Sequence, residues 1–243
     1  MTTVRYVLDK GYVELTNVAG PVRRRDAEFD GDIIDVARAA RVSYGKEALS
    51  RAREKDIKLV NRLHADRHTS PFEMITVWLN IKLPLFVKEQ WTRHRTWKYM
   101  HLNQISRRYS AEPVEYYVPG RLEWRKQSSL DKQGSGGYLD AVSSMAVDIW
   151  HRAHIFAFDK LYRLILSMGT ERGMARMDMP QSAYTRMTVS VDLLNLVHFL
   201  ELRRHSSAQY EIAVYANAIH ELLIEYLPGY TDIYGEVSQE SRT

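Results

Sequence analysis

Hydrophobic positions recur along this chain with strand-like and helix-like periods in alternation. The strongest strand signal covers residues 75–83, where every second position is apolar: Ile75, Val77, Leu79, Ile81 and Leu83. Such a period of two is typical of a strand with one buried face. Weaker patterns of the same kind cover residues 4–13 and 184–191. The chain is therefore predicted to contain at least one sheet.

Helical spacing of apolar residues accounts for most of the remaining length. Pro84 suits the first turn of one predicted helix, and Asp192 suits the N-cap of another. The predicted helices cover residues 32–43, 48–64, 84–91, 139–168, 171–176, 192–204 and 206–226. Residues 119–138 are basic and rich in serine and glycine, which predicts a surface loop. We expect one mixed α/β (α+β) domain over residues 1–243.

Composition narrows the possible classes of protein. A chain of 243 residues with 45% hydrophobic content can bury one sizeable core. No apolar stretch reaches the length of a membrane span and no signal-peptide pattern opens the chain, so we expect a soluble, cytoplasmic protein without membrane association. The absence of cysteine excludes disulfides, thiolate metal sites and a cysteine nucleophile. The formal charge of +4 suits anionic small molecules and does not demand nucleic acid.

The segment from Arg93 to Tyr109 concentrates positive charge. It reads RHRTWKYMHLNQISRRY, and no acidic residue occurs between Glu89 and Glu112. Most charge runs are solvated faces, but arginine also grips phosphate or carboxylate with two parallel hydrogen bonds. A helix that ends near Arg93, followed by an irregular loop to Tyr109, would gather its arginines: Arg93, Arg95, Arg107 and Arg108. This segment is a candidate anion site.

The same segment resembles the signature of the flavin-dependent thymidylate synthases, the ThyX family. The signature consists of Arg93-His94-Arg95, then Asn103, Ser106, Arg108 and Tyr109. Further elements follow in the family's order over roughly residues 5–228: Leu8-Asp9-Lys10-Gly11, Ala40-Arg41-Val42-Ser43, His68-Thr69-Ser70-Pro71-Phe72-Glu73, Ala175-Arg176, Tyr184-Thr185-Arg186 and Leu202-Arg203 with Gln209. Each motif alone is a weak signal. Because so many motifs occur in the same order, the probability of a chance match is very small.

The resemblance implies a fold, an activity and an assembly. The fold would be a central, mostly antiparallel sheet flanked by long helices. The activity would be reductive C5 methylation of a uridine 5′-monophosphate, with FAD as cofactor and with NADPH and 5,10-methylenetetrahydrofolate as co-substrates. Because the chain lacks cysteine, uracil activation would proceed without a thiol. Family members are homotetramers with sites between subunits, so the site residues need not meet within one chain.

The resemblance also assigns site residues. The candidate nucleotide contacts are Gln90, Arg93, Gln104 through its backbone, Ser106, Arg108, Arg176 and Arg203. Arg203 and Ser106 are the candidate catalytic residues. A cation at Arg203 would favour negative charge on the pyrimidine oxygens, whereas Ser106, at a position once considered a nucleophile, is assigned to binding. The candidate FAD contacts are Ser43, His68, Ser70, Glu73, Arg93, His94 and Arg95, with Asp192, His198 and Gln209 at further positions around the flavin.

Departures from the family pattern bear on the substrate. The segment Thr96–Ile105 is roughly three residues longer than in most members, by comparison of the motifs. Near the flavin, His198 and Ser207 replace the expected asparagine and histidine. Drift within an ordinary dUMP methylase is one explanation. The other is a longer loop that satisfies a ribose 2′-hydroxyl, as in relatives from nucleoside-antibiotic pathways that methylate UMP. We favour UMP.

The sequence is also compatible with two other functions and contains one candidate metal site. Trp97, Tyr99 and Tyr109 among arginines could stack single-stranded RNA, but known RNA-binding motifs are absent from the sequence and 30 acidic residues accompany 34 basic ones. The substitutions near the flavin also permit a methylation-deficient NADPH oxidase. His64 and His68 have the i, i+4 spacing of zinc ligands, yet no further ligand is implied. We expect no metal and no nucleic-acid partner.

Overall fold

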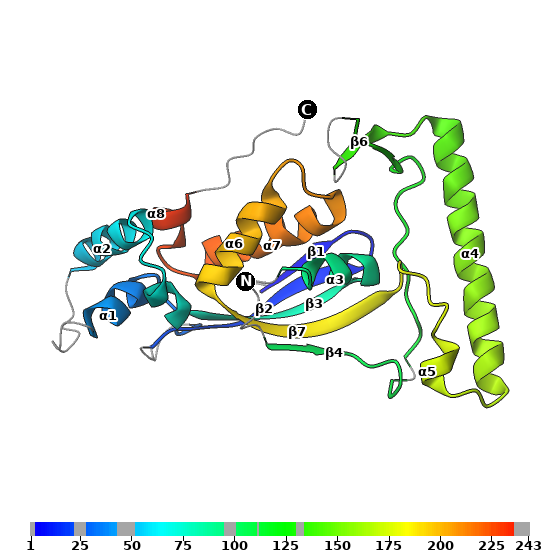
Figure 1. Ribbon diagram of the computed structural model, residues 1–243, viewed down its shortest axis with the longest axis horizontal. Coiled ribbons are helices and arrows are strands. Elements are labelled where there is room, and N and C mark those ends of the chain that lie inside the picture. Colours follow the sequence, from blue (N-terminus) through cyan, green and yellow to red (C-terminus); the bar gives the residue numbers. More distant parts are fainter. Residues whose placement is uncertain are drawn as a thin grey trace.

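The computed structural model describes residues 3–21, 28–42, 52–94, 101–110, 112–129 and 134–235. Its centre is a five-stranded sheet with the order β1-β2-β3-β7-β4, in which every neighbouring pair is antiparallel (Figure 1). The strands are β1 (Val4–Val7), β2 (Gly11–Ala19), β3 (Thr76–Pro84), β7 (Tyr184–Asp192) and β4 (His101–Gln104). This antiparallel sheet with long helices confirms the expected fold class.

One face of the sheet carries the main core. The alternation predicted for residues 75–83 is observed in β3, whose alternate apolar side chains are fully buried. Three helices cover this face: α3 (Leu85–Trp91), α6 (Leu193–Arg204) and α7 (Tyr210–Tyr226). Trp91 stacks on Phe199 of α6 with ring centroids 4.5 Å apart, and meets Tyr215 of α7 edge-on. The end of α3 is therefore fixed against both other helices, which positions the residues that follow it.

The strand predicted over residues 4–13 is instead a hairpin of β1 and β2. The chain reverses at Leu8, which has a left-handed φ of 55°, and at Gly11, where β2 begins. A Cβ atom at Gly11 would overlap the hydroxyl of Tyr215. That hydroxyl donates to the Lys82 carbonyl at 2.7 Å, so the absence of a side chain at Gly11 lets α7 pack directly on the sheet.

Two groups of helices lie at opposite ends of the sheet (Figure 1). At one end are α1 (Ile34–Val42), α2 (Arg53–Ala65), the 3-10 helix η1 (Ser70–Met74) and α8 (Tyr230–Tyr234). At the other end are α4 (Ala141–Ser167) and α5 (Arg172–Ala175). A second apolar cluster, including Tyr116, Phe158, Tyr162 and Ala183, joins α4 to the segment beside β7.

Three short strands occur where irregular structure was expected. The segment 119–138 contains a hairpin of β5 (Arg125–Gln127) and β6 (Ser135–Tyr138). β4 lies within the loop expected between Arg93 and Tyr109, because its backbone pairs with β7 although its own sequence is polar. Within the described ranges, no helix combines the length and the apolar character needed to cross a membrane.

Candidate functional site

Arg203, at the end of α6, contacts His94, which follows α3. The Nε of Arg203 donates a hydrogen bond to Nε2 of His94 at 2.6 Å. His94 is only 9% exposed, and its ring lies against Phe199 with centroids 5.0 Å apart. Burial, assisted by Arg203 and His198, lowers the pKa of His94 to about 4. His94 is therefore neutral at physiological pH and accepts a hydrogen bond from the guanidinium.

A second pair of polar side chains connects the same helices. Gln90, in the last turn of α3, donates through Nε2 to Oε1 of Gln209, the residue that precedes α7. Nε2 of Gln209 donates in turn to Oε2 of Glu211 at 2.8 Å. We name Gln90, His94, Arg203 and Gln209 the helix-side cluster. Arg93 is exposed beside it. The structure thus brings together three candidate nucleotide residues and three candidate flavin residues, with Arg93 on both lists.

Four other candidate nucleotide residues form a separate group, the strand-side cluster, comprising Gln104, Ser106, Arg108 and Arg176. Gln104 lies at the end of β4, where its Nε2 donates to Oγ1 of Thr185 at 2.9 Å. The Ser106 hydroxyl accepts from the backbone N–H of Arg108 at 3.3 Å. Arg176 follows α5 and shares with Gln104 the lining of a cavity of about 340 Å³.

Glu171 shows that the two arginines of the strand-side cluster share one electrostatic environment. Backbone N–H groups of Gly173 and Met174 chiefly lower the pKa of the Glu171 carboxyl, and the charges of Arg108 and Arg176 add to the effect. Glu171 also caps α5 by accepting from the N–H of Met174 at 2.8 Å. Two cations that act on one carboxylate beside a cavity are chemically suited to receive a phosphate group.

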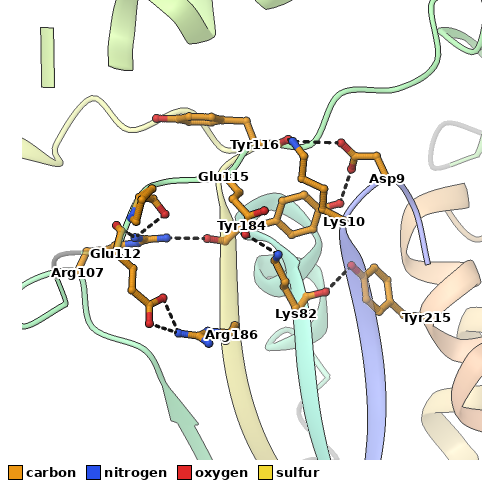
Figure 2. A network of polar contacts seen from close by, with 11 residues as sticks. Asp9, Lys10, Lys82, Arg107, Glu112, Glu115, Tyr116, Tyr184, Arg186 and Tyr215 are labelled. Atoms are coloured by element: carbon orange, nitrogen blue, oxygen red, sulfur yellow. Dashed lines mark hydrogen bonds and ion pairs between the residues drawn. The ribbon is translucent and has the colours of Figure 1, made fainter. Parts of the chain in front are cut away.

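Figure 2 shows how the loop after β4 is attached to the sheet. Nη1 of Arg107 donates to the carbonyl oxygen of Glu112 at 2.7 Å. The Glu112 carboxylate accepts two hydrogen bonds from Arg186 of β7, at 2.6 and 2.5 Å. Lys82 forms an ion pair with Glu115 at 2.5 Å. The guanidinium of Arg107, one of the four arginines expected to gather, thus donates to backbone carbonyls of this loop and of Tyr184.

The two clusters occupy different parts of the sheet. The helix-side cluster stands on α3, α6 and α7, whereas the strand-side cluster runs from the edge strand β4 to α5 (Figure 1). Gln104 pairs with the core residue Met187, so it lies at the edge of the face that the helices cover. Within the described part of the chain, no hydrogen bond joins one cluster to the other. A single chain therefore presents two half-sets of candidate nucleotide residues.

Three candidate flavin residues, on η1 and just before it, are exposed: His68, Ser70 and Glu73. The start of α6 lies against η1, since the N–H of Leu193 donates to the Ile75 carbonyl at 2.8 Å. His198 is exposed on α6, whereas the Asp192 carboxylate caps this helix by accepting from the N–H of Asn195 at 2.9 Å. Ser43 and Arg95, two further flavin candidates, lie outside the described residues.

Sequence reasoning did not single out Glu211 or the cavity that it lines. This cavity, about 530 Å³, lies between the β5–β6 hairpin and the starts of α3 and α7; its walls include Phe86, Tyr117, Trp124, His151, Gln209 and Glu211. Glu211 lies two residues after Gln209. The sequence spacing does not indicate that Gln209 bonds to both Glu211 and Gln90. His64 packs edge-on against Phe72 and Tyr234. No group of three or more potential metal ligands occurs among the residues that the structure describes.

Comparisons with known proteins agree with the fold. The sequence profile of the thymidylate synthase complementing protein family matches residues 28–229. A flavin-dependent thymidylate synthase of Thermus thermophilus is 41% identical over 222 residues, covering 91% of this chain and 74% of that protein. One from Anaplasma marginale is 36% identical over 237 residues, covering 98% and 76%.

Solved structures of the UMP/dUMP methylase PolB from Streptomyces cacaoi share the fold. The structure bound with 5-Br dUMP gives a TM-score of 0.76 at 28% identity, covering 93% of this chain and 95% of that one. The structure bound with 5-Br UMP gives 0.74 at 24% identity, covering 93% of each. The antiparallel sheet, its covering helices and the two polar clusters together define an α+β protein. The chain belongs to the family of flavin-dependent thymidylate synthases.

Proposed function

We propose that this protein catalyses the flavin-dependent reductive methylation of C5 in a uridine 5′-monophosphate and prefers UMP to dUMP. 5,10-Methylenetetrahydrofolate is the proposed carbon donor and NADPH the proposed reductant. The observation that carries the proposal is the contact between Arg203 and neutral His94 at the junction of α3 and α6. Family membership supports the same chemistry.

Arg203 is the residue that we assign to the reacting pyrimidine. Burial lowers the pKa of its guanidinium, but arginine remains charged at neutral pH. His94 accepts from Nε, and no residue in the described part of the chain hydrogen-bonds to the two terminal nitrogens of Arg203, which can therefore bind a ligand. Partial burial strengthens the interaction of this cation with negative charge that develops on a ring oxygen. Arg203 therefore stabilises an electron-rich pyrimidine without a thiol adduct, as the cysteine-free sequence requires.

The residues proposed for the cofactor fit a flavin. His68, Ser70 and Glu73 present hydrogen-bonding side chains to solvent from η1 and the residues before it, beside the start of α6. His198 adds an imidazole from α6, and Arg93 adds an exposed cation that suits a diphosphate. FAD, when bound, supplies the hydride that completes the methyl group. The protein residues bind and orient the two ring systems.

The strand-side cluster is proposed to hold the nucleotide phosphate, with Arg108 and Arg176 as its cations. Because no hydrogen bond or ion pair joins this cluster to the helix-side cluster among the described residues, we propose that the clusters of different subunits form each site in a homotetramer. The outer face of α4 supports self-association: Ile149, Trp150 and Phe156 are 64%, 66% and 65% exposed. Exposed apolar faces of this kind mark interaction surfaces.

The preference for UMP rests on the lengthened segment before Ser106. Its extra residues include Trp97 and Tyr99, which lie outside the described part of the chain. The segment leads directly into β4 and the strand-side cluster, so additional hydrogen-bonding groups would lie near the sugar and phosphate. A site that satisfies a 2′-hydroxyl discriminates against the deoxy compound. Among the relatives, PolB is described as a UMP/dUMP methylase.

A competition assay tests the proposal. Equal concentrations of UMP and dUMP are incubated with the protein, FAD, NADPH and methylenetetrahydrofolate, and the products are resolved by mass. We expect methylated UMP to dominate. Dominant methylated dUMP would identify an ordinary thymidylate synthase, and excision of the extra residues should then leave the product ratio unchanged. NADPH consumption without any methylated nucleotide would instead support the oxidase alternative.

A further inference from the structure

We infer that Glu211 and Gln209 form a hydrogen-bond relay that fixes the orientation of the Gln90 amide, so that Gln90 presents its carbonyl oxygen to the nucleotide. Glu211 and Gln209 are thus positioning residues, and Gln90 is a specificity residue that accepts a hydrogen bond from a donor group of the substrate. The inference rests on the proposed function, which makes a nucleotide the ligand of the helix-side cluster.

The direction of the relay follows from the chemistry of a carboxylate. Oε2 of Glu211 accepts from Nε2 of Gln209 at 2.8 Å, and Oε1 of Glu211 accepts from the Tyr117 hydroxyl at 3.4 Å. Burial, and then the charge of Glu211, raise the pKa of Tyr117, so its hydroxyl keeps its proton and donates. An ionised carboxylate can only accept. Gln209 must therefore turn its amide nitrogen toward Glu211.

The second amide is fixed by the first. With its nitrogen toward Glu211, Gln209 turns its oxygen toward Gln90, and Nε2 of Gln90 donates to that oxygen. The Oε1 of Gln90 makes no hydrogen bond to the residues that the structure describes. A free amide has two nearly equivalent orientations, whereas this relay allows one. Gln90 is one turn before His94, which binds Arg203, so its free oxygen lies in the region assigned to the nucleotide.

An acceptor at this place selects a ligand group that donates. In a uridine nucleotide these groups are the ring N3–H and the sugar hydroxyls. A cytidine nucleotide shares the sugar hydroxyls but has an unprotonated N3, which would face the Gln90 oxygen acceptor to acceptor. The comparison of UMP with CMP therefore distinguishes the two sources of the hydrogen bond.

The test reverses the relay and then restores it, with UMP binding to the FAD-loaded protein measured by calorimetry. In Glu211→Lys the carboxylate is replaced by a donor, so both amides turn over and Gln90 offers its nitrogen to the donor group of UMP. We expect the Kd for UMP to rise about 10- to 100-fold, the size expected when a donor group of the ligand faces another donor and is left unpaired. The cavity beside Glu211 has room for the longer side chain. A positive charge alone would tighten binding of an anion, so a loss of affinity identifies the relay.

Restoration separates positioning from a structural role. In the double variant Gln209→Glu/Glu211→Lys, the new carboxylate accepts from both the introduced ammonium group and Gln90, and the Kd should return to within about threefold of wild type. Glu211→Gln leaves both orientations populated, so about a twofold rise is expected. Glu221→Lys is the matched control: it makes the same charge change on α7 at a residue that pairs with Arg5, and should leave the Kd unchanged.

The outcomes are distinguishable. Unchanged UMP affinity in Glu211→Lys, or a double variant as weak as the single one, would overturn the relay while leaving the proposed function intact. A wild-type protein that binds neither UMP nor dUMP would overturn the proposed function, and the relay's role with it. A UMP-over-CMP preference that collapses in Glu211→Lys assigns the contact to N3–H. An equal loss for both nucleotides assigns it to a sugar hydroxyl.

Discussion

The helix-side and strand-side clusters differ in how firmly the fold holds them. In the helix-side cluster, His94 and Gln90 are joined to Arg203 and Gln209 across three helices that pack on the main core. In the strand-side cluster, Arg108 is exposed, and its loop is held mainly through the contacts of its neighbour Arg107.

This difference indicates that the two clusters have different roles in binding the nucleotide. A preorganised cation and acceptor suit the reacting ring, where small displacements change rates strongly. An exposed loop with arginines suits a phosphate group, which tolerates variation and can order the loop when it binds. Only the helix-side cluster needs the core for its geometry, so the two clusters should respond differently to mutation.

The largest effect is expected for Arg203→Ala. Loss of the cation beside the pyrimidine should lower kcat at least about 100-fold, comparable to removal of an oxyanion-stabilising donor, while FAD remains bound. Turnover and the flavin absorbance of the purified variant provide the two measurements. Arg204→Ala, which loses a contact with Asn217 from the neighbouring position of α6, is the control and should stay within a few fold of wild type. Normal turnover in Arg203→Ala would refute the assignment.

A smaller effect, on the cofactor, is expected for His68→Ala. Removal of the proposed hydrogen bond between His68 and FAD should weaken FAD binding about 10- to 100-fold. Flavin occupancy after dialysis measures this change. Arg108→Ala, in the strand-side cluster, should weaken UMP binding and keep its FAD. If His68→Ala retained full occupancy, this histidine would have no part in holding the flavin.

The smallest effect concerns stability and pH. The pKa of His94 in the folded protein is about 4, below the 6.5 of an ordinary histidine. The unfolded chain therefore binds a proton more readily between these values, so His94 lowers stability as pH falls from about 6.5 to about 4. His94→Gln keeps an acceptor for Arg203 but cannot titrate, so its unfolding midpoint should decline less steeply across this window. His154→Gln, on α4, is the control. Equal slopes in His94→Gln and wild type would contradict the burial of His94.

Strong periodicity made much of the fold predictable. The strand 75–83 and the helix 192–204 were recognised because burial of one face imposes the pattern and Asp192 supplies the cap. β4 was missed because its pairing depends on the backbone of β7 and leaves no apolar alternation. The hairpin of β1 and β2 was read as one strand, since the turn contains a left-handed Leu8 that no sequence pattern marks.

The resemblance proposes which residues make up the candidate site, but it does not predict how they are arranged. The resemblance named Gln90, Arg203 and Gln209, yet their contacts join residues more than a hundred positions apart. Arg107 looked like a fourth ligand arginine, and only the structure shows it binding the Glu112 carbonyl. Glu211 belongs to none of the motifs that carry the resemblance. Partner choice among similar polar side chains depends on three-dimensional packing, which the sequence pattern does not specify.

The central claim is that the two clusters, separated within one chain, form one site between subunits. To test it directly, the variants Arg203→Ala and Arg108→Ala are unfolded and refolded together, and methylation is assayed at a UMP concentration at which neither variant alone turns over. If a site takes Arg203 from one chain and Arg108 from another, about a quarter of the sites in random mixtures regain both residues. UMP methylation should then return to about a quarter of the wild-type rate. A mixture as inactive as its two components would contradict the account.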